Sequence, residues 1–250
     1  MKTTDSTQTE CGPSHRIPSR EAGEDKSRKA NEHFIPALSH DALTPAYDFL
    51  IALVMPERRF KSALIDAAAI DTAHRVLDVA CGTGTLLQMV AERHPSAALT
   101  GIDIDPKVLA RAKAKVGTKA VVELASATAM PFASGAFDIV LSSLAFHHLT
   151  REEKVAAMRE VHRVLRSGGE FHLGDFGPPH TPGMRIASFL TEKIGREHVA
   201  DNFAGLLVPM LHYAGFGLVE ETARFASIFG VLRTIRAFKA STRRPQGSAS

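Results

Sequence analysis

The stretch Val76 to Leu87, VLDVACGTGTLL, decides the fold of this chain. It starts inside an apolar run of β type, Arg75 to Val79, and continues into a turn of small residues that contains Gly82 and Gly84. An apolar pattern at helical spacing then begins at Leu86. The order is therefore strand, tight turn and helix, which is the unit from which open α/β sheets are built.

The two alternate glycines let a backbone approach a ligand closely and point a helix N-terminus at it. The dinucleotide fingerprint G-x-G-x-x-G would begin with Gly82 and Gly84, but Leu87 occupies its third glycine position. We expect Leu87 to prevent the close packing of helix on strand that this fingerprint needs. Asp78, shortly before the turn, would also repel a pyrophosphate. An NAD-dependent dehydrogenase is therefore disfavoured.

Two acidic residues flank the turn at the ends of strands. Asp78 lies at the end of the first strand, and the next strand, Ala98 to Asp103, ends in an acid roughly 20 residues after the turn. A carboxylate there can accept hydrogen bonds from both ribose hydroxyls of a nucleoside. Asp78 favours a ligand that carries cations and no phosphate, and S-adenosylmethionine, with its ammonium and sulfonium groups, is such a ligand.

The sequence resembles the class I S-adenosylmethionine-dependent methyltransferases, and more narrowly the small-molecule type that includes the ubiquinone/menaquinone C-methyltransferases. The resemblance rests on LDVACGTG (77–84), GIDIDP (101–106), AMPFASGAFDIVLSSLAFHHL (129–149) and EVHRVLRSGGEF (160–171). It implies an α/β, Rossmann-like fold with a seven-stranded, mostly parallel sheet, helices on both faces, an antiparallel last strand and an N-terminal helical lid.

The resemblance also implies which residues bind the cofactor: Asp78, Ala80, Cys81, Gly82, Gly84, Asp103, Ile104, Ser126, Ala127 and Ser143. Family members usually carry an acid at the position of Ser126, five residues before Pro131, and its carboxylate takes the adenine amino group. A neutral hydroxyl forms a hydrogen bond roughly half as strong, so we expect a somewhat lower cofactor affinity. Ala127 is expected to offer its backbone N–H to the adenine ring.

Strand and helix signals alternate through the middle of the chain. Strands are expected at 75–79, 98–103, 120–125, 137–141, 170–174, 218–224 and 229–238. Asp105 and Pro106 indicate one helix start, and a capping box, Thr150 to Glu153, indicates another; we expect Ser167 to Gly169 to end that second helix. The alternation requires a parallel sheet, and a terminal hairpin without a crossover helix requires one antiparallel strand.

Composition predicts one domain with an arm and a tail. Residues 1–35 have too few large apolar residues to offset the entropy of ordering and are expected to be disordered, as are 241–250. In the single domain, 36–240, we expect a helical lid (36–70), a cofactor-binding core (71–175) and a substrate-pocket insertion with the terminal hairpin (176–240). The resemblance places Tyr47 in the lid; the alternative is an ordinary helix with Tyr47 packed on the core.

Methyl transfer from a sulfonium depends mainly on positioning and desolvation, and a base is needed only where the acceptor must lose a proton. His147 is the candidate catalytic base, because it follows the fourth strand at the carboxyl edge where such sheets bind ligands. Asp175, at the end of the fifth strand, is a rival. Alternatively, His148 bonds neighbouring backbone, His147 is solvated and Asp175 caps a loop. No metal is expected, because the histidines do not cluster at ligand spacings.

The 250 residues carry a formal net charge of +3 and no apolar run near the roughly 20 residues of a membrane span. The N-terminus does not read as a secretory signal, so a cytoplasmic location is expected. Arg233, Arg236 and Lys239 follow the last acid, Glu221. We expect these basic residues to form a solvated strand face, with nucleic acid or anionic lipid as the alternative partner.

These features predict transfer of a methyl group from S-adenosylmethionine to carbon or oxygen of a small, apolar or aromatic acceptor. Nucleic acid is not the expected substrate, because Ser142 to Ala145 stands where base-amino methyltransferases carry an Asn/Asp-Pro-Pro-aromatic turn. The acceptor's identity and the oligomeric state stay open. The alternatives are a protein that binds S-adenosylmethionine or a partner without transferring a methyl group, and an NAD-dependent dehydrogenase.

Overall fold

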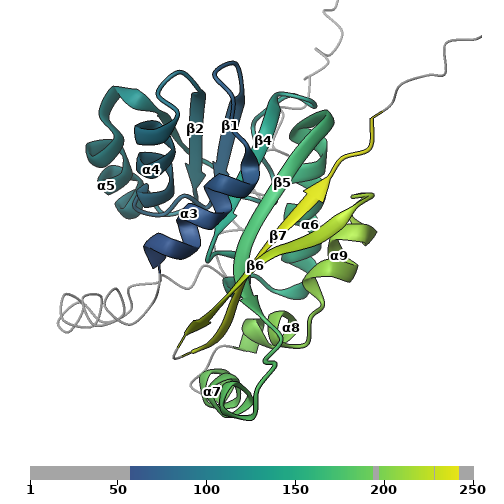
Figure 1. Ribbon diagram of the computed structural model, residues 1–250. Coiled ribbons are helices and arrows are strands. Elements are labelled where there is room, and N and C mark those ends of the chain that lie inside the picture. Colours follow the sequence, from purple (N-terminus) through teal and green to yellow (C-terminus); the bar gives the residue numbers. More distant parts are fainter. Residues whose placement is uncertain (1–56, 194–196, 228, 242–250) are drawn as a thin grey trace, which may run out of the picture. The chain divides into compact units, whose positions relative to one another are not determined.

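The computed structural model describes residues 57–193, 197–227 and 229–241 (Figure 1). A seven-stranded sheet organises them in the order β3-β2-β1-β4-β5-β7-β6. Its strands are β1 (Arg75–Val79), β2 (Ala98–Asp103), β3 (Val121–Leu124), β4 (Phe137–Ser143), β5 (Leu165–Gly177), β6 (Val219–Ser227) and β7 (Gly230–Phe238). The first five run parallel, whereas β7 pairs antiparallel with both β5 and β6. The predicted mostly parallel sheet with an antiparallel last strand is confirmed.

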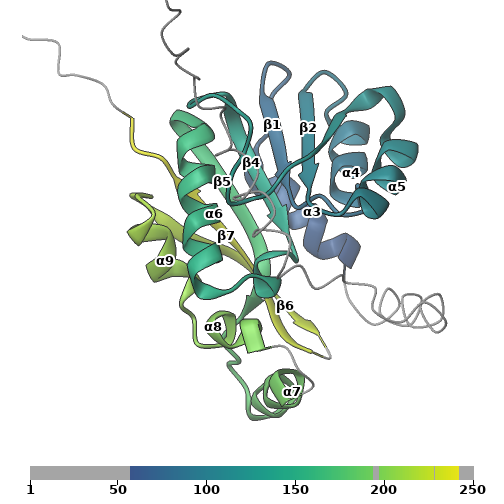
Figure 2. The ribbon, with the colours of Figure 1, turned by 180° about the vertical axis from the view of Figure 1, so that it is seen from behind.

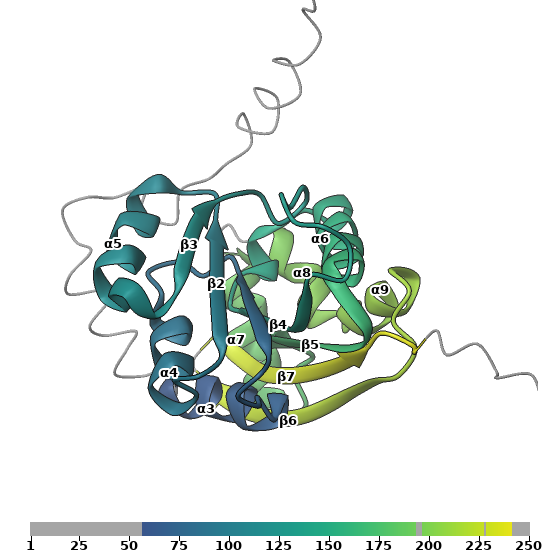
Figure 3. The ribbon, with the colours of Figure 1, turned by 90° about the horizontal axis from the view of Figure 1, so that it is seen from above.

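Helices cover both faces of this sheet (Figures 2 and 3). The α-helices are α3 (Glu57–Ala68), α4 (Thr85–Arg93), α5 (Pro106–Val116), α6 (Arg151–Val164), α7 (Pro182–Lys193), α8 (Ala200–Phe203) and α9 (Leu207–Tyr213), and the 3₁₀ turns are η1 (Gly117–Lys119), η2 (Phe146–His148) and η3 (Glu197–Val199). One buried cluster joins the sheet to α3, α4 and α5, and a second joins it to α6 and α9.

Alternate side chains of each strand serve the two clusters, as the period of a β-strand requires. In β1, Val76 packs with α4 and α5, while Leu77 and Val79 pack with α6. The Phe60 ring of α3 lies 2.6 Å from the point where a Cβ of Gly174 would stand. A side chain at that position of β5 would therefore displace α3 from the sheet.

Two helix starts follow the predicted capping chemistry. The Asp105 carboxylate accepts the N–H of Lys107 (2.7 Å), with Pro106 as the first residue of α5. At α6, Thr150 Oγ1 accepts the N–H of Glu153 (3.2 Å), and the Glu153 carboxylate accepts the N–H of Thr150 (2.9 Å). These caps satisfy backbone donors that a helix N-terminus otherwise leaves unpaired.

The prediction for the end of α6 is wrong. The helix ends at Val164, and Ser167 to Gly169 lie inside β5, which begins at Leu165 rather than at Glu170. Phe137 pairs with Leu165 and Ile139 with Glu170, so the extra residues of β5 form an irregular bulge against β4. Gly168 takes a φ of 72° there, and a Cβ on Gly169 would meet the Asp138 carbonyl at 2.9 Å. The glycines therefore serve a bulge within the strand rather than a helix stop.

The helix α7 carries its polar and apolar residues in an unusual arrangement. Ser188 is 4% exposed, whereas Ile186, Phe189 and Leu190 are 63%, 58% and 53% exposed. The apolar side chains of α7 therefore face away from the core, and its serine faces inward. None of the helices in the described ranges is long and apolar enough to cross a bilayer.

Several predicted segments lie outside the described residues. They are the arm at 1–35, the part of the lid that contains Tyr47, and the tail beyond residue 241. The described part of the predicted lid is α3 together with the residues that lead into β1.

Candidate functional site

The glycine turn after β1 is held in a strained, left-handed backbone. Ala80, Gly82 and Gly84 have φ values of 56°, 55° and 76°. The N–H of Cys81 donates to the Ile102 carbonyl (2.9 Å), which fixes the turn to β2. A Cβ on Gly82 would meet nothing within 4 Å, whereas one on Gly84 would stand 3.1 Å from Ala112. Gly84 therefore serves close packing of α4 on α5, and Gly82 presents bare backbone to open space.

The expected packing penalty of Leu87 is absent. Gly101 of β2 faces this helix, and the Leu87 methyl group Cδ1 lies 2.4 Å from the point where a Cβ of Gly101 would stand. The glycine that permits close approach is thus on the strand, and the bulky residue is on the helix. The prediction that Leu87 prevents close packing is wrong. Helix and strand pack closely because the residue without a side chain is Gly101 on the strand, opposite Leu87.

Asp103 joins the turn to the end of β2. Its Oδ2 accepts the N–H of Gly82 (2.8 Å), and its Oδ1 accepts the N–H of Asp105 (3.0 Å). An ionised carboxylate can accept about four hydrogen bonds, so both oxygens retain capacity for ligand hydroxyls. Ile104 follows it as a half-buried residue of the same edge.

Asp78 is the most perturbed acid of the site. It is 1% exposed, and its Oδ2 has no hydrogen-bond partner among the described residues. Burial raises its pKa to about 7, with Asp103 adding to the rise and Lys61 opposing it. Ser143, at the end of the neighbouring β4, likewise has a buried hydroxyl without a partner in the described part. A cationic group with N–H donors would satisfy both side chains and favour the ionised carboxylate.

A basic residue reaches the turn from a distant helix. Lys115 of α5 donates from Nζ to the hydroxyls of Thr83 (3.2 Å) and Thr85 (2.8 Å). Burial lowers the pKa of Lys115, as does the nearby Lys61. The turn itself contains no basic residue, but its surroundings are less uniformly anionic than the sequence suggested.

The loop after β3 brings Ser126 and Ala127 to the same edge as half-buried residues. Ser126 Oγ lies 2.9 Å from the Thr128 hydroxyl and accepts the N–H of Thr128 at 3.2 Å. A bridge between Ser126 and Ala129 closes the loop. The hydroxyl at this position is therefore shared with its own loop.

The two rival bases form one hydrogen-bonded pair. His147 Nδ1 lies 2.9 Å from Asp175 Oδ1, and the backbone N–H of His147 donates to Oδ2 at 3.2 Å. Their side chains are 4% and 0% exposed, so His147 is not solvated and Asp175 is not a simple loop cap. Burial raises the pKa of Asp175, but the His147 charge and hydrogen bonds from His147 and Phe176 bring it below its usual range. This His147–Asp175 pair lies where β4 and β5 end.

A fully buried lysine stands behind this pair. Lys154 of α6 donates from Nζ to the His198 carbonyl (2.5 Å) and lies 3.6 Å from Asp201 Oδ2. Burial lowers the pKa of Lys154, while Asp201 and Asp175 raise it. Arg151 holds Asp201 from the exposed side through Nε at 3.1 Å. These contacts tie η3 and α8 to α6.

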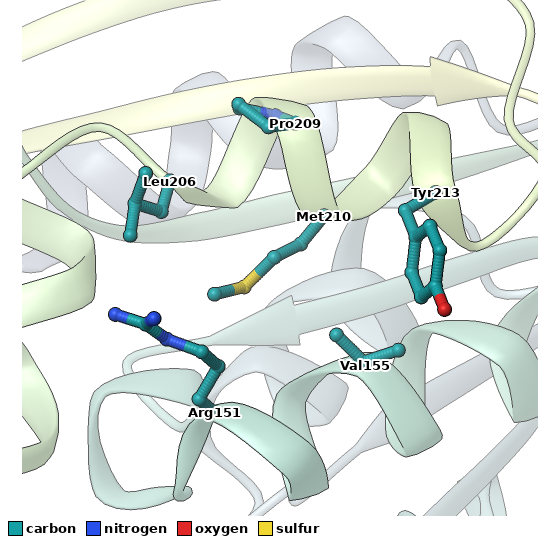
Figure 4. Close-up of a pocket in the computed structure, with 6 residues that line it drawn as sticks. All are labelled: Arg151, Val155, Leu206, Pro209, Met210 and Tyr213. Atoms are coloured by element: carbon teal, nitrogen blue, oxygen red, sulfur yellow. The ribbon is translucent and has the colours of Figure 1, made fainter.

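A separate groove of about 250 Å³ lies between α6 and α9. Figure 4 shows the side chains that line it. It is lined by Arg151, Val155, Leu206, Pro209, Met210 and Tyr213. None of these side chains belongs to the glycine turn or to the His147–Asp175 pair. Within the described residues no group of His, Cys, Asp and Glu could hold a metal ion.

Known proteins match this arrangement. A family described as "Methyltransferase domain" matches residues 76–169, the segment from β1 into β5. An uncharacterised methyltransferase of Synechocystis is 37% identical over 169 residues, which cover 66% of this chain and 77% of that protein. The chain belongs to the class I S-adenosylmethionine-dependent methyltransferases. The cofactor of this methyltransferase is S-adenosylmethionine.

Two further comparisons extend the assignment. A demethylmenaquinone methyltransferase of Thermus thermophilus is 37% identical over 142 residues, which cover 55% of this chain and 64% of that relative. The methyltransferase thus spans less than two thirds of that relative's length. The crystal structure of YcgJ from Bacillus subtilis superposes with a TM-score of 0.62 at 18% identity, covering 74% of this chain and 99% of that one, which is a likeness of fold.

The residues of the methyltransferase fit the chemistry of its cofactor. Buried Asp78, with an unpartnered oxygen, suits an ammonium group, and Asp103 suits ribose hydroxyls. Sequence reasoning missed two residues near this edge, Lys154 and Arg233. Lys154 lies at helical spacing from Met158 and Val161 on the buried side of α6. This spacing could have indicated its burial, but a lysine is normally expected to be exposed.

Proposed function

We propose that this methyltransferase moves a methyl group from S-adenosylmethionine to carbon or oxygen of a small aromatic acceptor that loses a proton during the reaction. The observation that carries the proposal is the buried His147–Asp175 pair at the carboxyl edge of the sheet. A methyl acceptor that is already a good nucleophile would need no such pair.

The pair can act as a general base with an orienting carboxylate. With Nδ1–H donating to Asp175, the Nε2 of His147 is the nitrogen that takes up the acceptor's proton. Asp175 then stabilises the imidazolium without itself becoming protonated, because its pKa lies below the usual range. The bound cofactor supplies the methyl group, which the acceptor's electron pair takes as the carbon–sulfur bond breaks and the electrons remain on sulfur.

The remaining site residues position the cofactor in this proposal. Asp78 and Ser143 would accept from its ammonium group, and Asp103 from its ribose. Ala80, Cys81, Gly82, Gly84 and Ile104 would contact it through backbone, with Ser126 and Ala127 at the adenine. In-line displacement depends on this alignment more than on any single functional group.

An aromatic diol is the acceptor class we favour. The Thermus thermophilus relative is named for demethylmenaquinone, whose reduced ring is a hydroxylated naphthalene. Loss of a phenolic proton makes both the ring carbon and the oxygen nucleophilic, which is why the choice between carbon and oxygen stays within one acceptor class. A protein that binds the cofactor without transferring its methyl group would have no use for a base.

The test measures the release of S-adenosylhomocysteine with 1,4-naphthohydroquinone as acceptor. Wild-type protein should turn over, and His147→Gln should lose about 10²–10⁴-fold in kcat with little change in cofactor affinity. Asp175→Asn should lose activity as well, because it favours the wrong tautomer. Exposed His180 provides the control, and His180→Gln should retain activity. Full activity of His147→Gln would show that His147 is not a general base.

A further inference from the structure

Arg233 of β7 is a buried cation with too few partners. It is 8% exposed, although the sequence predicted a solvated strand face. Its Nη1 donates to Glu221 Oε2 at 3.3 Å, but Nε and Nη2 have no partner among the described residues. Burying hydrogen-bond donors without partners destabilises the folded protein, and a ligand that accepts from them would relieve that cost.

The position of Arg233 places it next to the proposed base. In the antiparallel β5–β7 pair, Asp175 is the direct partner of Arg233, so their Cβ atoms lie about 5 Å apart on one face of the sheet. The Arg233 side chain then runs over Gly177, where a Cβ would stand 2.5 Å from its Cδ and Nε. The guanidinium thus extends from Asp175 toward the carboxyl edge, and the glycine leaves room for it.

The local charges do not balance around this guanidinium. Arg224 of β6 is the register partner of Arg233 on its other side, and it also pairs with Glu221. Two cations therefore share one carboxylate. Asp175 accepts hydrogen bonds from His147 and from the N–H of Phe176, and it accepts none from Arg233. Within the described ranges, the Nε and Nη2 donors of Arg233 therefore stay unpaired on the strand that lies next to Asp175.

Two neutral polar side chains near the same strand ends are also unpaired. Ser188 of α7 is 4% exposed and lies 2.7 Å from the point where a Cβ of Gly230 would stand. Asn202 of α8 is fully buried, and neither its Oδ1 nor its Nδ2 has a partner in the described part. Ser188 thus lies beside the first residue of β7, on the face opposite to Arg233, and Asn202 is a second buried side chain whose polar atoms lack partners in the described part.

We propose that Arg233 binds the acceptor's oxygen and stabilises the phenolate-type oxyanion that forms when His147 removes its proton. This deepens the proposed function, on which it rests, and restricts the acceptor to aromatic compounds that carry an ionisable hydroxyl group near the methylated atom. In this arrangement the proton moves to Nε2 of His147, and the negative charge left on the acceptor faces Arg233.

The first test measures binding without methyl transfer, using 4-nitrophenol and its neutral ether 4-nitroanisole at a pH where the phenol is ionised. Wild-type protein with S-adenosylhomocysteine should bind the phenolate about tenfold or more tightly than the ether. Arg233→Met should abolish that preference, while Arg233→Lys should keep part of it. Arg224→Met, at an exposed site on the same Glu221, should keep it fully. An equal affinity of the wild type for both probes, or a preference that survives in Arg233→Met, overturns the proposal.

A second measurement separates ligand binding from folding. If Arg233 serves a ligand, Arg233→Met should unfold at the same temperature as the wild type or higher, because an uncompensated buried charge has been removed. A large loss of thermal stability would make Arg233 structural instead. Release of S-adenosylhomocysteine with naphthohydroquinone as acceptor distinguishes the two proposals. A lowered kcat of Arg233→Met with residual activity supports both, whereas wild-type protein that binds the phenolate but never turns over contradicts only the methyl transfer.

Discussion

The buried carboxyl group of Asp78, a residue that fits the cofactor's ammonium group, lowers the stability of the ligand-free protein. Burial raises its pKa to about 7 from 3.8, so the folded protein holds a proton that the unfolded chain has already released between those values. The free energy of unfolding therefore falls as the pH rises through that window, and it stays reduced above pH 7. A bound cation would reverse the shift.

Asp78→Asn should consequently stabilise the ligand-free protein at high pH. Above pH 7 its free energy of unfolding should exceed that of the wild type by on the order of 2–4 kcal/mol, and the difference should vanish below pH 4. Urea unfolding at several pH values measures this. The control is Asp66→Asn, since Asp66 has a side chain 72% exposed. Parallel pH profiles for the two variants would show that Asp78 is not the responsible group.

Asp103→Asn should lose binding of S-adenosylmethionine at micromolar concentrations. Each ribose hydroxyl loses a charged acceptor worth about 1.5–3 kcal/mol. The asparagine variant is preferable to alanine, because Asp103 also accepts the N–H groups of Gly82 and Asp105 and one amide oxygen can retain part of that role. Titration calorimetry measures the loss, with Asp105→Asn as a control that keeps the helix cap. If Asp103→Asn bound S-adenosylmethionine with the affinity of the wild type, Asp103 would not be the residue that binds the ribose.

At the scale of elements, α4 and β2 are fitted to each other through Leu87 and Gly101. Gly101→Ala should destabilise the protein by about 1–3 kcal/mol, because its Cβ would fall 2.4 Å from the Leu87 methyl group. Leu87→Ala in the same chain should recover much of that loss, so the two changes should not be additive. Denaturant unfolding of the double-mutant cycle measures the coupling. Gly183→Ala, where a Cβ meets nothing within 4 Å, is the matched control.

The tie between α6 and α8 contains one buried and one exposed cation. Lys154→Met should cost about 1–3 kcal/mol, because it leaves the His198 carbonyl and Asp201 without their buried donor. Arg151→Met should cost at most about 1 kcal/mol, since its side chain is 61% exposed. Thermal unfolding of both variants decides the order. A larger loss of stability in Arg151→Met than in Lys154→Met would show that the exposed ion pair contributes more than the buried lysine.

For the whole molecule, the ligand that stabilises it should be the sulfur nucleoside. Binding at about 100 to 1,000 times the dissociation constant adds roughly 2.7–4.1 kcal/mol to the free energy of unfolding. Millimolar S-adenosylmethionine or S-adenosylhomocysteine should reach this range, whereas equal NAD or ATP should add little, even with Lys115 beside the turn. Thermal-shift assays compare the four directly. Stabilisation by NAD alone would show that the glycine turn binds a dinucleotide, as in the dehydrogenases.

The strands and the helix starts could be predicted because they depend on local signals. The strand at Arg75–Val79, the caps at Asp105 and Thr150, and the terminal hairpin each follow from neighbouring residues. The pairing of His147 with Asp175 and the burial of Arg233 could not, because they depend on how β4, β5 and β7 align across long separations. The bulge in β5 was missed for the same reason, since two glycines after a helix usually end it.

The fit of Leu87 against Gly101 limits how this sequence can evolve. A glycine at position 87, which would complete the dinucleotide fingerprint, would leave a void until position 101 gained a side chain. A side chain at position 101 alone would collide with Leu87. Each single step crosses a less stable intermediate, so a lineage can exchange one arrangement for the other only through paired changes. The packing of α4 on β2 thus restricts the residues that positions 87 and 101 of this chain can exchange.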